Sequence, residues 1–348
     1  MQGVKFKYSV DALKVCYKLT LDLYTTLTSN PIKEQCFIFK SPDYKDDLVE
    51  DFRLQRIKIE EREFEILIPD TEKIGEFSKY GYLEIKPKED TKFAGMCFIT
   101  LDNRRLYEPF AVWHEVLTYK KVKNSEPFDF TLPMSEYIKH MPKKVPASTK
   151  RIQYNSIGFL EEMASRLGLT LNSISNLEIA LDSNINFAKI IKNTVANDDY
   201  VPVINKRKYP DIDSRNTLNN THLQYSTTRK RAVNLSYLIK QSNGNLQLKC
   251  YNKSREIEEK SKKTYIYTWL GMDKNIHRME ITAKWQKIKE YLEAQSITKE
   301  FFLYNLHTGE NLSEPFERWL NTLIHFKKAG KNKGSISLFE LVVLNREK

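Results

Sequence analysis

Apolar and polar residues follow one another in short runs over roughly the first 120 residues, and this pattern predicts β-strands. Three runs rich in β-branched and aromatic residues are bounded by Pro, Gly or Asp: FEILIP (64–69), YGYLEIKP (80–87) and AGMCFITLD (94–102). Residues 10–27, VDALKVCYKLTLDLYTTL, fit a strand at their start and a helix at their end, and the pattern does not decide between them. Residues 140–155 are predicted to form a linking loop.

The middle of the chain begins with a helix and continues with strands. Ile157, Leu160, Ala164 and Leu167 recur at helical spacing, and Gly168 is the expected C-cap. Residues 196–220 are rich in Asn, Asp, Pro and Lys, which predicts a long loop. SNGN (242–245) is a hairpin signal between two of the predicted strands. Those strands are NLEIALDS (176–183), LQYST (223–227), AVNLSYLIK (232–240), NLQLKCYNK (245–253) and HRMEITAK (277–284).

Helical spacing returns after residue 284, first in Trp285, Ile288 and Leu292. Ser313 and Pro315 are residues that open a second helix. Together these elements predict an α+β fold with a mainly antiparallel sheet and flanking helices over 1–285. Residues 286–348 are predicted to form a small helical appendage.

Composition indicates the cellular compartment in which the protein is expected. The 348 residues are 41% hydrophobic and 29% charged, as expected of a folded domain with a core. A run of about 18 apolar residues is missing, as is the long apolar segment of a signal peptide, so we expect a cytoplasmic protein without membrane contact. Four dispersed cysteines fit reduced thiols and argue against a zinc site or a disulfide frame.

The formal net charge of +11 is concentrated in one part of the chain. Between Lys206 and Lys263, 14 Lys and Arg residues stand against 5 Asp and Glu residues, a local charge of +9. A basic region of this kind suits a polyanion, with nucleic acid as the leading candidate. The alternative is a solvated face on a lysine-rich protein.

Candidate chemistry lies on the strand LEIALD. Because side chains two apart share one face of a strand, Glu178, Ala180 and Asp182 point to one side and the intervening apolar residues to the other. Two carboxylates on one face repel unless a cation or proton lies between them, and hard divalent ions favour oxygen ligands. This predicts Mg²⁺ or Mn²⁺, whereas the simpler interpretation is a half-exposed strand whose acids pair with lysines.

Two further strands carry charged residues in the same manner. Arg278 and Glu280 share a face of HRMEITAK, and CYNKSREIEEK places Tyr251, Lys253 and Glu256 at the end of a strand. Three strands that each bear a carboxylate make one common site more credible than any of them alone.

The ordered set LEIALD, QYSTTRK, CYNKSREI and HRMEI resembles the rolling-circle replication initiators of the Rep-trans type. The related relaxases of conjugative elements share the pattern. The resemblance covers residues 175–285, within a motif-bearing part of 150–285, and YNKSREI followed by HRMEI is its most specific portion.

The resemblance implies an enzyme that nicks and rejoins one strand of origin DNA through a transient 5′-phosphotyrosine. Carried over by position, Tyr225 is the nucleophile, while Lys253 and Arg278 are further catalytic residues. Mg²⁺ or Mn²⁺ would be held by the acids of the motifs, namely Glu178, Asp182 and Glu280. Phosphate contacts are expected from two basic runs, Arg229, Lys230 and Arg231, and Lys206, Arg207 and Lys208.

The sequence also departs from the pattern and leaves alternatives open. Thr227 replaces the motif glycine, and the long spacing from Tyr225 to Tyr251 makes Tyr237 a rival nucleophile. A relaxase would use the same chemistry, and a DNA-binding protein without catalysis would use the acids as structural salt-bridge partners. The expected partner is origin DNA, as duplex and single strand, with a host helicase and a second copy of the chain as further candidates.

Overall fold

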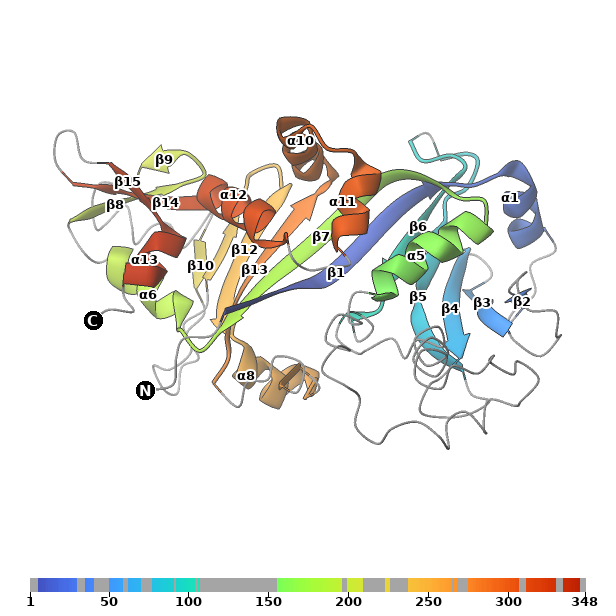
Figure 1. The fold of residues 1–348 in the computed structure, drawn as a ribbon, viewed down its shortest axis with the longest axis horizontal. Helices are drawn as coiled ribbons and strands as arrows, with labels where there is room; N and C mark the ends of the chain where they lie inside the picture. The colour runs from blue at the N-terminus through green and yellow to red at the C-terminus, as the bar shows by residue number, and fades with distance from the viewer. Residues whose placement is uncertain are drawn as a thin grey trace, which may run out of the picture. The chain divides into compact units, whose positions relative to one another are not determined.

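The computed structural model describes residues 6–29, 35–40, 50–58, 62–69, 77–90, 92–103, 106, 155–195, 199–208, 223–225, 237–264, 266–267, 275–306, 311–329 and 334–344. The chain divides into two compact units (Figure 1). We call residues Ala12–Ser173 the N-terminal unit, and Met1–Asp11 together with Ile174–Lys348 the C-terminal unit. Strands β1 (Phe6–Lys18) and β7 (Thr170–Ser183) each contribute residues to both units.

The N-terminal unit is an antiparallel sheet that packs against one helix. Its strands follow the order β1-β6-β5-β4-β3-β2. Phe159 of α5 (Asn155–Arg166) makes edge-on ring contacts with Phe52 and Tyr80, so the helix covers the aromatic face of the sheet. The other elements are α1 (Leu21–Thr28), β2 (Cys36–Lys40), β3 (Glu50–Lys58), β4 (Glu63–Pro69), β5 (Phe77–Ile85) and β6 (Met96–Leu101).

The C-terminal unit contains the strands that bear the candidate chemistry. They follow the order β10-β11-β12-β13-β7-β1, and the pairs from β10 to β7 are antiparallel. Their bounds are β10 (Leu223–Tyr225), β11 (Tyr237–Lys240), β12 (Leu246–Asn252) and β13 (His277–Lys284).

One face of these strands is apolar and buried. Helices α6 (Phe187–Val195) and α12 (Ser313–Leu323) pack against β12 and β13. Burying this face stabilises the unit, because each fully buried aliphatic side chain contributes about 1.5–3 kcal/mol. The residues that line it are Leu177, Ile179, Leu181, Leu248, Cys250, Met279 and Ile281.

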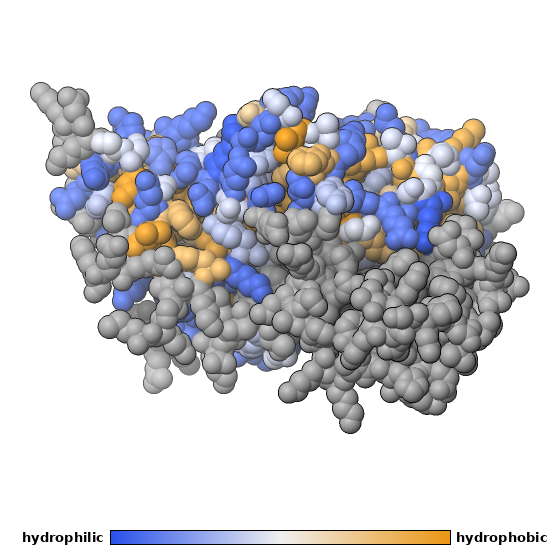
Figure 2. Space-filling view, viewed as in Figure 1, coloured by the Kyte–Doolittle hydropathy of each residue, from blue (hydrophilic) through white to orange (hydrophobic). Residues whose placement is uncertain are grey.

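Residues after 284 add both helices and strands to the C-terminal unit. The helices are α10 (Trp285–Gln295), α11 (Lys299–Leu306), α12 and α13 (Leu338–Leu344). The strands β14 (Ile324–Lys328) and β15 (Ser335–Ser337) belong to a second sheet of order β15-β14-β8-β9, with β8 (Tyr200–Ile204) and β9 (Arg207–Lys208). In the described part of the face in Figure 2, hydrophilic residues predominate around smaller hydrophobic patches.

The α+β class with a mainly antiparallel sheet is as predicted. The predicted loop at 196–220 is wrong over Tyr200–Ile204, because this apolar stretch pairs with β14 and buries Val203 and Ile204. The ambiguous 10–27 stretch is a strand up to Lys18 and a helix from Leu21. Of the predicted linker at 140–155, residues 140–154 lie outside the described residues, and Asn155 begins α5. Among the described helices, none has the length and apolar character needed to cross a membrane.

Candidate metal and phosphodiester site

Strand register brings the acids of β7 and β13 onto one face. Glu280 lies directly opposite Ala180, and Arg278 lies directly opposite Asp182. Directly opposed residues of antiparallel strands present their side chains on the same face. Together with Glu178, which is opposite Thr282, they form the polar face that the sequence alternation predicted. We call this the carboxylate face.

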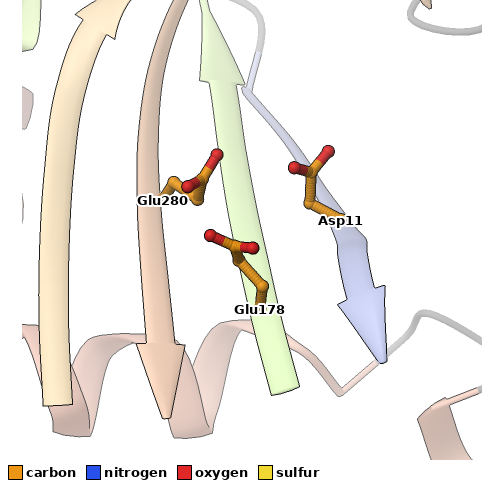
Figure 3. Close-up of side chains that lie close together, drawn as sticks. All are labelled: Asp11, Glu178 and Glu280. Carbon is orange, nitrogen blue, oxygen red and sulfur yellow. The ribbon is translucent and has the colours of Figure 1, made fainter. Parts of the chain in front are cut away.

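Three carboxylates converge on this face. Oxygen atoms of Asp11, Glu178 and Glu280 all lie within 4.8 Å of one another, and Figure 3 shows the side chains pointing toward a common point from β1, β7 and β13. A cluster of this kind could hold a metal ion, because carboxylate oxygens are the ligands that Mg²⁺ and Mn²⁺ prefer. The sequence motifs did not include Asp11, and its signal was a lone acid within the apolar run VDALKV.

Proton binding at the two glutamates reflects their proximity. Burial, together with the hydrogen bond and the negative charge of Glu178, raises the pKa of Glu280 to about 8. For Glu178, burial acts in the raising direction, but hydrogen bonds from Glu280 and Lys249 and the charge of Lys249 outweigh it and lower the pKa. Near neutral pH the pair therefore holds one proton, because two negative charges at this distance would repel each other.

Three neighbours hold the glutamates in place. The Lys249 ammonium on β12 donates to Oε1 of Glu178 at 3.0 Å and also to Oε1 of Glu280. The Tyr251 hydroxyl donates to Oε2 of Glu280 at 3.0 Å, and Thr282 donates to Glu178 at 3.0 Å. Such outer partners fix the orientation of carboxylates that would ligate a metal.

Arg278 joins the other two acids of the face. Its Nε and Nη2 donate to the two oxygens of Asp182 at 2.8 and 2.7 Å, and its Nη1 donates to Asp11 at 2.6 Å. The side chains of Arg278 and Asp182 are both fully buried. The structure thus brings Asp182 to the site as a partner of the arginine, and places Asp11 with the two glutamates in the triad.

Lys253 lies where β12 ends and α8 (Lys253–Glu256) begins (Figure 1). Asn252 caps this turn by accepting from the backbone N–H of Arg255 at 2.9 Å. The Lys253 ammonium pairs with Glu256 at 2.8 Å and lies 5.8 Å from the centre of the Tyr251 ring. Burial and the nearby Arg278 charge lower the pKa of Lys253, so this cation is held close to the arginine end of the carboxylate face.

The candidate nucleophiles lie toward the β10 end of the sheet. Tyr237 is directly opposite Cys250, which is opposite Met279, so its side chain lies on the apolar face and is only 7% exposed. Tyr225 is the last residue of β10 and has the register position directly opposite Tyr237, on the same side of the sheet by strand parity; the structure describes its backbone alone. Tyr251 on β12 contacts the carboxylates, because its hydroxyl donates to Glu280, a contact that sequence order did not reveal.

The predicted phosphate contacts are separated in the chain. Arg229–Arg231 fall outside the described residues. Lys206 belongs to the turn between β8 and β9, where Asn205 and Lys206 both have positive φ, and Arg207 and Lys208 form β9. This second basic run therefore lies in the smaller sheet, and its turn is joined to the larger sheet by a hydrogen bond from Asn205 to the backbone carbonyl of Lys240 on β11, at 2.7 Å.

No family model matches this sequence, and neither does any curated protein. Among solved structures, the chain is similar to a rolling circle replication initiator protein from Geobacillus stearothermophilus, with a TM-score of 0.41 and 9% sequence identity. The similarity covers 98% of this chain and 95% of that chain. A likeness this distant does not identify an activity, so the functional conclusion rests on the residues of the site.

Proposed function

We propose that this chain is a replication initiator that nicks and rejoins one strand of DNA through a tyrosine nucleophile and a divalent metal ion. The observation that carries the proposal is the convergence of three carboxylates beside a buried arginine on one sheet face. The order of the sequence motifs, which resembles the Rep-trans initiators, supplies the reaction type. The basic region around 206–263 suits a DNA partner.

The donor set fits Mg²⁺ or Mn²⁺. Asp11, Glu178 and Glu280 would hold the ion through hard oxygen atoms. Counted as ionised, these three acids and Asp182 carry four negative charges, against two positive charges on Arg278 and Lys249, so the metal-free face keeps a net charge of −2 that favours a divalent cation. A bound ion would polarise the phosphodiester and stabilise its developing charge.

The protein residues have distinct tasks in this proposal. Arg278 orients Asp11, and Tyr251 orients Glu280, through the hydrogen bonds described above. The phenol oxygen of Tyr225 attacks phosphorus and forms the phosphotyrosine bond, while the bond from phosphorus to the 3′ oxygen breaks. The departing 3′ oxygen takes up the proton that the phenol gives up and becomes a hydroxyl, and reversal of the same step reseals the strand.

Cations would assist both binding and attack. A tyrosine hydroxyl has an ordinary pKa near 10, so a cationic environment is needed to favour the phenolate. The basic run Arg229–Arg231 follows Tyr225 closely in sequence and would serve the phenolate and the phosphates alike. Lys206–Lys208 would add contacts to the backbone of duplex DNA.

Nicking of supercoiled DNA tests the proposal. The full chain is incubated with Mn²⁺ and supercoiled plasmids that carry the DNA surrounding its gene, and open circles and covalent adducts are counted. Tyr225→Phe should abolish both products, whereas Tyr237→Phe serves as a control that leaves them. Adducts that survive in Tyr225→Phe and vanish in Tyr251→Phe would transfer the nucleophile to Tyr251.

One observation favours a second function, a DNA-binding protein without catalysis. Lys249 pairs with both glutamates and Arg278 pairs with Asp182, which is the pattern expected of structural salt bridges. DNA binding that is unchanged by chelator, with neither nick nor adduct in any divalent ion, would decide for this alternative.

A further inference from the structure

Lys249 occupies an unusual place for a cation at a metal site. It lies on β12 directly opposite Glu280, and its ammonium contacts Oε1 of Glu178 and Oε1 of Glu280 at the same time. These two glutamates are also members of the carboxylate triad with Asp11. An ammonium and a divalent ion would therefore compete for the same two side chains.

The two cations of the carboxylate face differ in their freedom to move. Arg278 is fully buried and is fixed by paired hydrogen bonds to Asp182 and a third bond to Asp11. The side chain of Lys249 is 39% exposed and ends in a compact ammonium on a flexible four-carbon stem. Of this pair, Lys249 is the cation whose own charge can move into solvent when it leaves the carboxylates, and a divalent ion that takes its place would then balance the buried Glu280.

We propose that Lys249 is an exchangeable cation of the carboxylate site. Before a divalent ion binds, its ammonium neutralises Glu178 and Glu280 and keeps the two acids together. When the ion takes their oxygens, the ammonium swings into solvent on the same face and pairs with a phosphate of the bound DNA strand. This inference rests on the proposed function, because it requires the metal and the DNA of that proposal.

Exchange predicts that metal affinity depends on Lys249 in a defined direction. Lys249→Met removes the competing charge, so Mn²⁺ should bind about tenfold more tightly in the absence of DNA. Tenfold corresponds to about 1.4 kcal/mol, which lies within the range for a partly solvated charge pair. Lys249→Arg keeps the charge and adds a planar fork that grips carboxylates more firmly, so Mn²⁺ should bind several-fold more weakly.

Lys14→Met provides a matched control. Lys14 is also a strand lysine, with 36% side-chain exposure, and it pairs with a single glutamate, Glu84, at 3.2 Å in the N-terminal unit. Its replacement removes the same charge from the chain but leaves the carboxylate site untouched. The affinity for Mn²⁺ should therefore remain that of the unmodified protein.

The experiment measures free Mn²⁺ by electron paramagnetic resonance during titration of the full chain without DNA. Tighter binding by Lys249→Met together with weaker binding by Lys249→Arg supports exchange. Equal or weaker binding by Lys249→Met overturns it. Because Lys249→Met leaves two acids facing each other, its melting temperature should also rise more on Mn²⁺ addition than that of the unmodified chain, and a smaller rise overturns the proposal too.

A further variant separates this inference from the proposed function. Asp11→Asn removes the triad member that pairs with Arg278, and it should weaken Mn²⁺ binding in any case. If Asp11→Asn weakens binding but Lys249→Met does not strengthen it, the exchange is wrong and the metal site stands. If the unmodified chain and every Lys249 variant fail to bind Mn²⁺, both the exchange and the metal site are wrong.

Discussion

The proton shared by Glu178 and Glu280 should make the stability of the fold depend on pH, and Glu280→Gln should remove most of that dependence. Glu280 has a pKa of about 8 in the folded chain against an ordinary value of 4.5, chiefly because it is buried and secondly because Glu178 lies beside it. Between these two values the folded state holds a proton that the unfolded state has lost. The stability from this proton is complete below about pH 4.5 and is lost as pH rises through about 8.

The magnitude follows from the difference between the two pKa values. At about 1.4 kcal/mol for each pH unit, Glu280 alone would lower the free energy of unfolding by about 5 kcal/mol between pH 4.5 and 8. Glu178 acts in the opposite direction, because its lowered pKa adds stability that is present above its unfolded value and lost on acidification. That contribution changes only below about pH 4.5, so between pH 5 and pH 9 Glu280 dominates and we expect a net loss of about 4 kcal/mol.

The assay is urea unfolding from pH 5 to pH 9 in the presence of a chelator. Glu280→Gln stays neutral throughout, so its free energy of unfolding should not show this loss. Between pH 5 and pH 9 it should gain about 4 kcal/mol of stability relative to the unmodified chain. Glu293→Gln on α10, where Glu293 is 65% exposed beside Lys289, serves as the control and should follow the unmodified chain. Parallel profiles for Glu280→Gln and the unmodified chain would refute the shared proton.

Three further predictions concern the same face. As the pH rises toward 8, Mn²⁺ affinity should increase by up to about tenfold per pH unit, and it should level off above pH 8, because binding expels the proton of Glu280. Calorimetry in buffers of different ionisation enthalpy would detect the released proton. Arg278→Met should lower the free energy of unfolding, measured with urea, by about 3–5 kcal/mol, because Asp182 is left buried and unpaired. The double variant Arg278→Met with Asp182→Leu should recover most of that loss, and an equally unstable double variant would contradict this explanation. Asp11→Asn should change the free energy of unfolding by about 1 kcal/mol or less, because the amide oxygen can still accept from Arg278. The same variant should weaken Mn²⁺ binding at least about tenfold in a titration, and unchanged Mn²⁺ affinity would show that Asp11 is not part of the site.

The strands of the site were predictable because each has a strict alternation. LEIALD and HRMEITAK place apolar residues on one face and charged residues on the other, and burial of the apolar face under α6 and α12 fixes that orientation. The partners across strands were not predictable, because register depends on turns and on strand order. Asp11 is more than 160 residues from Glu178 in sequence, and strand order alone brings β1 beside β7.

The cross-strand partners give different roles to residues that the sequence motifs had grouped together. Glu178 and Asp182 share a face, but Asp182 is directly opposite Arg278, which binds both of its oxygens, while Glu178 is opposite Thr282. Tyr237 alternates onto the apolar face, a consequence of its register with Cys250. The loop prediction at 200–204 failed because the polar residues around this short apolar stretch concealed a strand that pairs with β14.

Mapping of a covalent protein–DNA adduct tests the central claim most directly. The full chain is incubated with Mn²⁺ and a pool of random-sequence single strands labelled at the 3′ end, digested, and analysed by mass spectrometry for the tyrosine that carries a 5′ phosphate. The proposed function predicts an adduct on Tyr225 that disappears with chelator and in Asp11→Asn. Single-stranded DNA that binds to the chain but forms no covalent adduct, in either Mn²⁺ or Mg²⁺, would contradict the proposed function.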